Sequence, residues 1–323
     1  MKDKNLDKLS ETELLDLRDG IDRRLKESAK RPVVKPGKTI ELAVLAVQHQ
    51  TVRCRMLDGG QRLTLRPKHE PYRIAEGQIL TVLPAKQWAY KRTAYVSGEI
   101  LDSRIDAPAL GLTPLKLEDE WTWDPAEEYW GEPDEPVDEN LKPIIAAGPR
   151  PGYVMEQILP GDDPTDPDTD PIGQAVDLYE AGDLTGSIKV LQKCLCSDLR
   201  VLDAHAHLGI WAFGDGSNSV GVEQARRHYE AGAAIGELSL GPEFRSVLQW
   251  GRINNRPFLR CLSGLGICHW ALGDLNKAAT VFRRILWLNP PDNQGARICL
   301  WNIERGRTYS ECQKIDRSAR GEC

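Results

Sequence analysis

The chain of 323 residues lacks any long hydrophobic run, because its longest apolar stretches, around residues 43–47 and 211–213, fall far short of the about 20 residues of a membrane-spanning helix. The first residues are charged and contain no apolar core, so neither a signal peptide nor a transit peptide is expected. The sequence also has no C-x-x-C pair and no G-x-x-x-x-G-K-[ST] phosphate loop. We therefore expect a cytoplasmic protein without a membrane segment, in which the eight cysteines are reduced and mostly buried.

The net charge of −6 is unevenly distributed along the chain. Residues 118–170 contain 17 of the 48 acidic residues and only two of the 42 basic ones, Lys142 and Arg150. The rest of the chain holds 40 basic and 31 acidic residues. Residues 118–170 thus set the acidic isoelectric point, and the remainder of the chain is mildly basic.

The residue patterns predict an α+β multidomain protein that begins with a helical part, residues 1–32. Leucine and isoleucine recur at three- and four-residue spacings from residue 6 to residue 26, which is typical of one amphipathic helix. Ser10 and Glu13 form a capping box near its start. The charges on this helix alternate in sign, which favours a packing or dimerisation role.

Between residues 37 and 106 the apolar spacing changes to two, which predicts strands. Cys54 and Met56 alternate with Arg53 and Arg55, and a similar run follows the turn at residues 58–60. That turn, Asp-Gly-Gly, supplies the residues that a tight hairpin requires. Four or five short strands with no helix between them indicate a small barrel, either SH3-like or OB-like.

Residues 107–171 form an acidic segment rich in proline and tryptophan. Proline fixes φ and like charges repel, so the Asp-Pro run at residues 161–171 should stay extended. Trp121, Trp123 and Trp130 argue that part of this acidic segment docks on another part of the protein, since exposed indoles favour aggregation. We expect a strap or linker between two folded parts.

From residue 172 onward the apolar spacing is helical and repeats. The clearest copy carries seven residues at the offsets of one signature: Leu262, Leu265, Gly266, Gly273, Ala278, Phe282 and Pro290. Small residues at two of these positions let paired helices approach, and the phenylalanine fills the space between repeats. This pattern resembles that of tetratricopeptide-repeat (TPR) proteins. The resemblance covers residues 172 to about 305 and implies an all-α TPR-like helical array. We expect this array to occupy residues 172–310 and a flexible tail to follow at 311–323.

Earlier copies of the repeat are less regular. In the second copy Gly209 and Ala225 are 16 residues apart, whereas Gly266 and Ala278 are 12 apart, and residues 238–257 are a further insertion. The first copy, from Ala175 to Leu191, fits in part. As a whole, the order of parts resembles an uncharacterised bacterial family with an N-terminal small β domain and C-terminal TPR-like repeats. That resemblance implies an architecture and a cytosolic location, but no reaction.

Candidate chemistry is sparse. His205 and His207 look like a His-x-His metal motif, but on a helix residues two apart point about 200° apart around the axis. Cys194 and Cys196 diverge in the same way, so core packing is the preferred interpretation. Acidic residues are abundant but gathered in the acidic segment rather than in a pocket. We therefore expect no catalytic residues, no metal site, no cofactor and no enzymatic activity.

Two binding surfaces remain as hypotheses. The first is a protein-binding groove lined by the first helix of each repeat, which would make the chain a non-enzymatic scaffold. Its expected residues are Tyr179, Asp203, Phe213, Arg260, Trp270, Arg297 and Trp301. For two of these, Trp270 and Trp301, packing between helices is an equally good interpretation.

The alternative is that the barrel binds RNA or single-stranded DNA. Residues 50–105 hold ten basic and five acidic residues. The expected nucleic-acid face consists of Arg53, Arg55, Arg62 and Arg66 with Trp88 and Tyr90 nearby. The competing explanation, which we favour from the sequence, is that the acidic segment docks on this face and covers its charge. Docking of that segment on the helical repeats stays open as well.

Overall fold

The computed structural model describes residues 10, 14–15, 17–18, 20–21, 34, 37–68, 74–91, 93–131, 134 and 136–319. Most of the amphipathic helix expected at residues 6–26 lies outside the described residues. The chain divides into two compact units. The first, the barrel unit, comprises Met1–Pro71 and Ile79–Arg104, and the second, the helical unit, comprises Tyr72–Gln78 and Ile105–Cys323.

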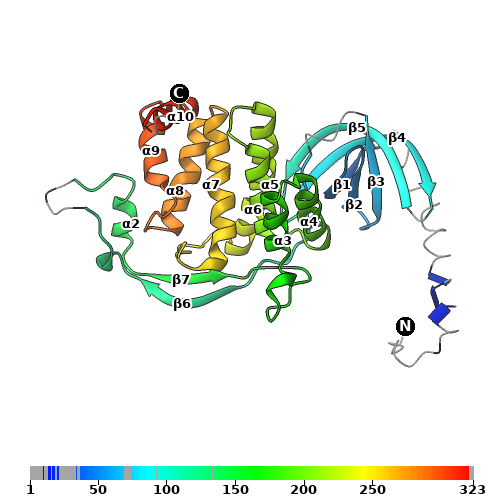
Figure 1. The fold of residues 1–323 in the computed structure, drawn as a ribbon, viewed down its shortest axis with the longest axis horizontal. Helices are drawn as coiled ribbons and strands as arrows, with labels where there is room; N and C mark the ends of the chain where they lie inside the picture. The colour runs from blue at the N-terminus through cyan, green and yellow to red at the C-terminus, as the bar shows by residue number, and fades with distance from the viewer. Residues whose placement is uncertain are drawn as a thin grey trace. The chain divides into compact units, whose positions relative to one another are not determined.

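The barrel unit is a closed five-stranded barrel, which confirms the small β barrel predicted from the alternating residues (Figure 1). Its strands, joined in the order β1-β2-β3-β5-β4, are β1 (Ile40–Val47), β2 (Val52–Met56), β3 (Arg62–Pro67), β4 (Gln78–Tyr90) and β5 (Thr93–Ile105). β1 pairs antiparallel with both β2 and β4, and β3 pairs parallel with β5, so the ring has no free edge. Inward-pointing side chains such as Leu42, Leu65 and Val96 are completely buried.

The predicted hairpin between β2 and β3 is confirmed. Gly59 and Gly60 have φ angles of 77° and 67°, which glycine adopts without the steric cost that a Cβ atom imposes. Cys54 lies opposite Leu63 in the register, and both side chains are buried. This register decides which residues of the two strands face outward.

The helical unit contains nine α-helices among its described residues. They are α2 (Lys142–Ala146), α3 (Pro171–Glu180), α4 (Leu184–Ser197), α5 (Leu202–Phe213), α6 (Ser219–Leu240), α7 (Arg256–Ala271), α8 (Leu275–Leu288), α9 (Ala296–Glu304) and α10 (Tyr309–Ala319). α5 packs against α6 and α7, and α8 packs against α7 and α9, as Figure 1 shows. α10 occupies most of the stretch for which the sequence suggested a flexible tail. Short 3-10 helices η3 (Pro125–Glu127), η4 (Pro167–Thr169) and η5 (Ile253–Asn255) complete the unit.

Close approaches at glycine bring these helices together. A Cβ atom at Gly266 on α7 would lie 2.9 Å from the ring of Phe282 on α8, and one at Gly209 on α5 would lie 2.6 Å from the ring of Tyr229 on α6. Phe282 is 1% exposed and Ala278, one turn before it, is fully buried. The small and large residues singled out in the sequence are thus paired in the helix contacts.

The acidic segment is folded into the helical unit. β6 (Leu117–Trp123) and β7 (Arg150–Met155) form an antiparallel pair. The loop between α6 and α7 adds to the edge of this pair, because Tyr153 N donates to Val247 O (3.0 Å) and Val247 N donates to Pro151 O (3.0 Å). The buried side chain of Asn255 accepts from Met155 N (2.8 Å) and donates to Tyr153 O (2.9 Å). An ordered two-stranded sheet therefore stands where the sequence suggested a strap.

Our preferred expectation that the tryptophans of this segment dock on the barrel is wrong. Trp121 lies under the guanidinium of Arg252 (4.6 Å), and Glu120 pairs with the same arginine (3.2 Å). Trp123 is 3% exposed and meets Trp130 edge-on at 6.3 Å. All of these partners belong to the helical unit. The indole side chains pack within the helical unit because that unit offers arginine side chains and backbone edges to pack against.

Arg150 holds the sheet to the helices. Its guanidinium lies between the rings of Trp123 (4.8 Å) and Trp287 (4.2 Å), and its Nη1 donates to the carbonyl oxygens of Arg245 (3.2 Å) and Trp287 (3.0 Å). The residue is 5% exposed. Burial lowers the pKa of the guanidinium to about 10, so it remains cationic at neutral pH. In the part of the chain that the structure describes, two indole faces and no carboxylate balance this charge.

Replacing Phe282 by alanine should lower the free energy of unfolding by about 3 to 5 kcal/mol, because a completely buried ring leaves a cavity against Gly266. Urea denaturation followed by circular dichroism measures the loss. Thr280→Ala on the exposed face of the same helix is the control and should change stability by no more than about 0.5 kcal/mol. A loss below about 1 kcal/mol for Phe282→Ala would contradict the packing described.

Arg150→Ala should destabilise the helical unit by about 2 to 4 kcal/mol and raise hydrogen exchange in β6 and β7, since it removes two buried stacking contacts and two hydrogen bonds. Arg252→Ala removes an exposed arginine from Trp121 and serves as the matched control, with an expected cost below about 1 kcal/mol. Equal exchange rates in the two variants would show that Arg150 does not fasten the sheet.

Candidate functional site

Three of the predicted groove residues come together on one surface of the helical unit. Tyr179 on α3 stacks on Trp211 of α5 with ring centroids 4.8 Å apart and planes 7° from parallel. Asp203, at the start of α5, accepts a hydrogen bond from Arg260 Nη1 of α7 (2.8 Å). His207 lies between these contacts, 3.8 Å from Asp203 and 5.7 Å from the centre of the Trp211 ring.

The surface continues onto the segment before α7. Arg256 and Arg260 both lie over the ring of Trp250, at 5.4 and 5.8 Å, and Arg256 Nε also donates to Trp250 O (3.0 Å). We call this set the α3–α5–α7 row: Tyr179, Asp203, His207, Trp211, Trp250, Arg256 and Arg260. Tyr179 is 44% exposed, and the others except Asp203 are half-buried.

The remaining predicted groove residues lie elsewhere. Trp270 is 5% exposed and donates from its indole nitrogen to Arg307 O (2.8 Å), while Phe213 and Trp270 each meet Tyr309 of α10 edge-on. Both are packing residues because α10 closes over them. Arg297 pairs with Asp292 (3.1 Å) at the start of α9.

Trp301, on α9, is 43% exposed and lies under Arg305 (3.9 Å) and Arg307 (4.7 Å). Both arginines directly follow the C-terminal end of α9, the helix that carries Trp301. The residue is therefore a surface aromatic outside the α3–α5–α7 row.

Sequence reasoning missed four members of the row. His207 and Trp211 follow Asp203 at i+4 and i+8, so helical spacing alone could have placed them on one face of α5. Arg256 precedes Arg260 by four residues on α7 in the same way. Trp250 lies in a loop, and no sequence pattern points to it.

Charge within the row is largely compensated. Burial lowers the pKa of His207, and Arg260 adds to the lowering, while Asp203 works in the opposite direction. His207 is thus a neutral imidazole at neutral pH beside an Asp203–Arg260 ion pair. The row is a fixed surface of rings and paired charges.

A second cluster of polar side chains is buried inside the helical unit. Glu76, from the segment Tyr72–Gln78, is 1% exposed, and His205 and His228 are 0% and 5% exposed. Gln192 donates to Glu76 Oε1 (3.2 Å), and Glu76 Oε2 lies 3.9 Å from His228 Nδ1. The ring centres of the two histidines are 6.3 Å apart.

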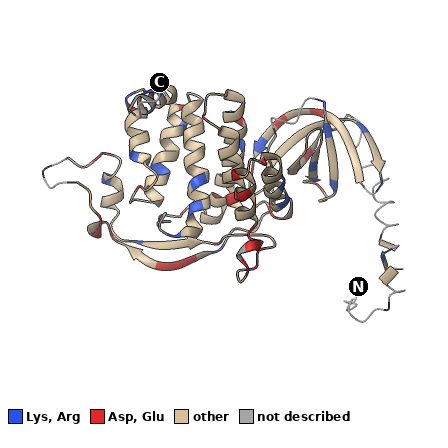
Figure 2. Cartoon of the chain, viewed as in Figure 1, with Lys and Arg blue, Asp and Glu red and all other residues tan. Residues whose placement is uncertain are grey.

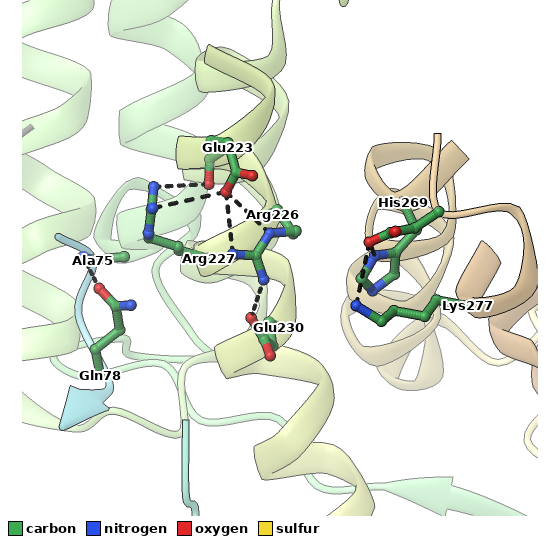
Figure 3. Close-up of polar contacts among 9 residues, drawn as sticks. Ala75, Gln78, Glu223, Arg226, Arg227, Glu230, His269 and Lys277 are labelled. Carbon is green, nitrogen blue, oxygen red and sulfur yellow. Dashed lines mark hydrogen bonds and ion pairs between the residues drawn. The ribbon is translucent and has the colours of Figure 1, made fainter. Parts of the chain in front are cut away.

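Hydrogen bonds set the tautomers in this cluster. His205 Nε2 donates to Leu199 O (3.1 Å), which leaves its Nδ1 unprotonated when the ring is neutral. Gln224 donates to His228 Nε2 (3.3 Å) and to Ile74 O (2.9 Å), so the proton of His228 lies on Nδ1, toward Glu76. A hydrogen bond from Ala75 N to Gln78 Oε1 (2.8 Å) closes the turn that carries Glu76 (Figure 3).

Both histidines of this cluster are neutral at neutral pH. Burial lowers the pKa of His205 to about 4 and that of His228 to about 3, and for His228 the neighbouring His205 and Arg227 add to the effect. Arg227 is itself held by Glu223 on α6, as Figure 3 shows (Nη1 to the carbonyl oxygen, 3.1 Å). His205 faces this buried cluster and His207 faces the row, so the His-x-His pair diverges as its helical spacing predicts.

Other reactive groups have inert surroundings. Burial raises the pKa of the Cys54, Cys194 and Cys261 thiols, and it raises that of Cys268 and Cys299 to about 12. Thiols with raised pKa values are poor nucleophiles at neutral pH. Within the described part of the chain, no group of three or more His, Cys, Asp or Glu side chains is arranged to hold a metal ion.

The barrel carries the other predicted face. Arg53 lies opposite Thr64 and Arg55 lies opposite Arg62 in the β2–β3 register, while Arg66 lies beside Ser97 in the β3–β5 register. Since the intervening residues are buried, all four arginines point outward. Trp88 and Tyr90, on β4, are 36% and 61% exposed. The two registers place the four arginines on neighbouring strands. The role of these residues in binding nucleic acid stays a prediction.

No protein-family model matches the chain, and no curated protein matches it. None of the helices described is both long enough and apolar enough to cross a membrane.

Acidification should weaken the helical unit through its buried histidines. Their pKa values are lower in the folded chain than the value of about 6.5 in the unfolded chain, so the unfolded chain binds more protons below that pH and stability falls with falling pH. Between pH 7 and pH 5 we expect a loss of about 1 to 2 kcal/mol for each histidine.

Urea denaturation at the two pH values tests this expectation. His228→Gln should lose less stability on acidification than the wild type, whereas Thr280→Ala, which removes no titratable group from an exposed position, should lose as much as the wild type. An equal loss in the wild type and in His228→Gln would mean that His228 does not titrate differently in the two states.

Proposed function

We propose that the protein is a non-enzymatic binding protein whose helical unit holds a segment of another protein on the α3–α5–α7 row. The single observation that carries the proposal is the stacked pair of Tyr179 and Trp211 beside the fixed guanidinium of Arg260. Tyrosine, tryptophan and arginine are the side chains that most often dominate binding energy at protein interfaces. Here they are concentrated on one partly exposed surface that spans three helices.

The row is also preorganised. Stacking fixes the Tyr179 and Trp211 rings, and the ion pair with Asp203 fixes Arg260, so little side-chain freedom remains to be lost on binding. The aromatic end suits an apolar side chain of the partner, and the arginine end, with Arg256 four residues away, suits an acidic one. An extended segment that carries both types fits the row best.

The helix contacts support a TPR-like assignment of this unit. Consecutive helices pair through glycine against an aromatic ring, as at Gly266 and Phe282, and the row lies on α3, α5 and α7, the first helix of each pair. Helical repeats of this type bind segments through such surfaces. The buried cluster around Glu76 supports a non-enzymatic role, because its histidines are closed to a substrate.

Site-specific crosslinking tests the proposal. The photoreactive residue p-benzoylphenylalanine is placed at Tyr179 in the full chain and expressed in the native host. We expect one or a few proteins to crosslink at this position and not at Lys189, an exposed control position on α4. The crosslinked peptide, identified by mass spectrometry and synthesised, should bind wild-type protein, and Tyr179→Ala should weaken that binding about 10- to 100-fold.

A second variant tests whether the loss of binding in Tyr179→Ala comes from the lost contact or from loss of folding. Arg260→Lys keeps the charge but loses the planar guanidinium over Trp250, and it should weaken binding of the same peptide without changing the circular dichroism spectrum. Crosslinks that are identical at Tyr179 and Lys189, or a peptide whose affinity is unchanged in both variants, would contradict the proposal.

A further inference from the structure

The outer face of the barrel carries a row of side chains that crosses four strands. The pairs Arg53–Thr64 and Thr64–Tyr95 follow from the registers of β2, β3 and β5, and Tyr95 stacks on Trp88 of β4 with ring centroids 5.4 Å apart and planes 13° from parallel. Directly paired residues point to the same face of a sheet. A cation at one end and a stacked aromatic pair at the other therefore lie on the same face of the barrel wall, with the buried Thr64 between them.

Arginines flank this row on both sides. Arg55 and Arg62 lie directly opposite each other on β2 and β3, and Arg66 lies beside Ser97 on β3 and β5. Like charges placed directly across a strand pair repel each other and weaken the pairing.

Described carboxylates of the barrel unit pair with only some of its cations. In the described ranges, Arg53, Arg62 and Arg66 form no ion pair, whereas nearby Lys68 pairs with Glu99 and Arg104 pairs with Glu41. Figure 2 shows basic residues on the barrel strands and acidic residues along β6 of the helical unit. The indoles of the acidic segment are packed against Arg150 and Arg252, so they do not serve as the cover considered from the sequence.

Exposed aromatic rings and a cavity lie near these arginines on the barrel. Trp88 is 36% exposed and Tyr90 is 61% exposed, with Lys91 5.5 Å from the centre of the Tyr90 ring. A hollow of about 420 Å³ adjoins Arg66 and Ser97, and Leu83 and Pro84 contribute apolar walls. Aromatic planes and apolar walls suit unpaired bases, whose faces stay hidden inside a duplex.

We propose that this outer face of the barrel binds single-stranded nucleic acid without reading its sequence. Arg53, Arg55, Arg62 and Arg66 contact successive phosphates, and Trp88 and Tyr90 stack on bases. Arg53 and Arg55, two residues apart on β2, are separated by about 6.6 Å, and Arg62 and Arg66, four residues apart on β3, by about 13 Å. The arginines thus extend along two neighbouring strands over a length that an extended phosphate backbone can match. This site is independent of the α3–α5–α7 row and of the function proposed for it.

Fluorescence anisotropy with the full chain and a labelled 20-nucleotide oligo(U) or oligo(dT) tests the proposal at several salt concentrations. Binding should weaken steeply with salt, because each phosphate contact releases condensed counterions. The double variant Arg53→Ala/Arg62→Ala should bind at least tenfold more weakly, and its slope of log affinity against log salt should fall by about 1.4 in magnitude. Arg53→Lys/Arg62→Lys should keep the wild-type slope.

The aromatic part is tested separately. Trp88→Ala should weaken binding about five- to 150-fold and leave the salt slope unchanged, because stacking on a base releases no counterion. Arg283→Ala/Lys277→Ala removes the same charge from exposed positions on α8 and serves as the control, with affinity within about twofold of the wild type. A labelled duplex of the same length and a heparin oligosaccharide serve as competitors.

The possible failures are distinct. Absence of binding to both single strands at 50 mM salt overturns the proposal. Loss of affinity in the control variant equal to that in Arg53→Ala/Arg62→Ala assigns binding to net charge alone. Tighter binding of the duplex, or of heparin with no effect of Trp88→Ala, makes the face a general polyanion surface and also overturns it.

Discussion

A buried arginine that meets indoles and no carboxylate among the described residues holds the helical unit together along one edge. Arg150 carries its charge into a site between Trp123 and Trp287, where the negative faces of two indoles and two main-chain carbonyl oxygens replace water. Trp123 comes from the acidic segment, Trp287 from α8 and one of the carbonyls from the loop after α6. One side chain therefore joins three parts of the chain that are far apart in sequence.

Several other features depend on this contact. With Arg150 in place, β7 lies where its backbone can pair with Val247 and where Asn255 can bind both Tyr153 and Met155. Asn255 directly precedes α7, whose first turns carry Arg256 and Arg260. The α3–α5–α7 row therefore rests on a loop that the sheet β6–β7 holds in place, although no residue of the sheet belongs to the row.

The two units use their charges differently. In the helical unit, arginines pair with nearby carboxylates or lie over indoles, so most of their charge is balanced locally. On the barrel, by contrast, three arginines on neighbouring strands, Arg53, Arg62 and Arg66, form no ion pair within the described part of the chain. Balanced charge suits a surface that recognises a protein segment by shape, whereas unbalanced charge suits a polyanion. The two binding proposals follow from this difference.

The sequence by itself determined what depends on local periodicity and turn chemistry. Alternation of period two and the Asp58-Gly59-Gly60 turn specified the barrel strands and their outward-facing arginines, because strand geometry places every second side chain on one face. Helical spacing likewise specified the helices after residue 172 and the divergence of His205 and His207. Only the tertiary structure decided where the acidic segment lies, which aromatic residues are packed and which form a surface row, and that Glu76 meets His228. The physical reason is that an indole, a buried arginine or a buried glutamate can be satisfied by any partner of suitable chemistry, and the choice among partners depends on contacts between residues a hundred or more positions apart that no local pattern contains.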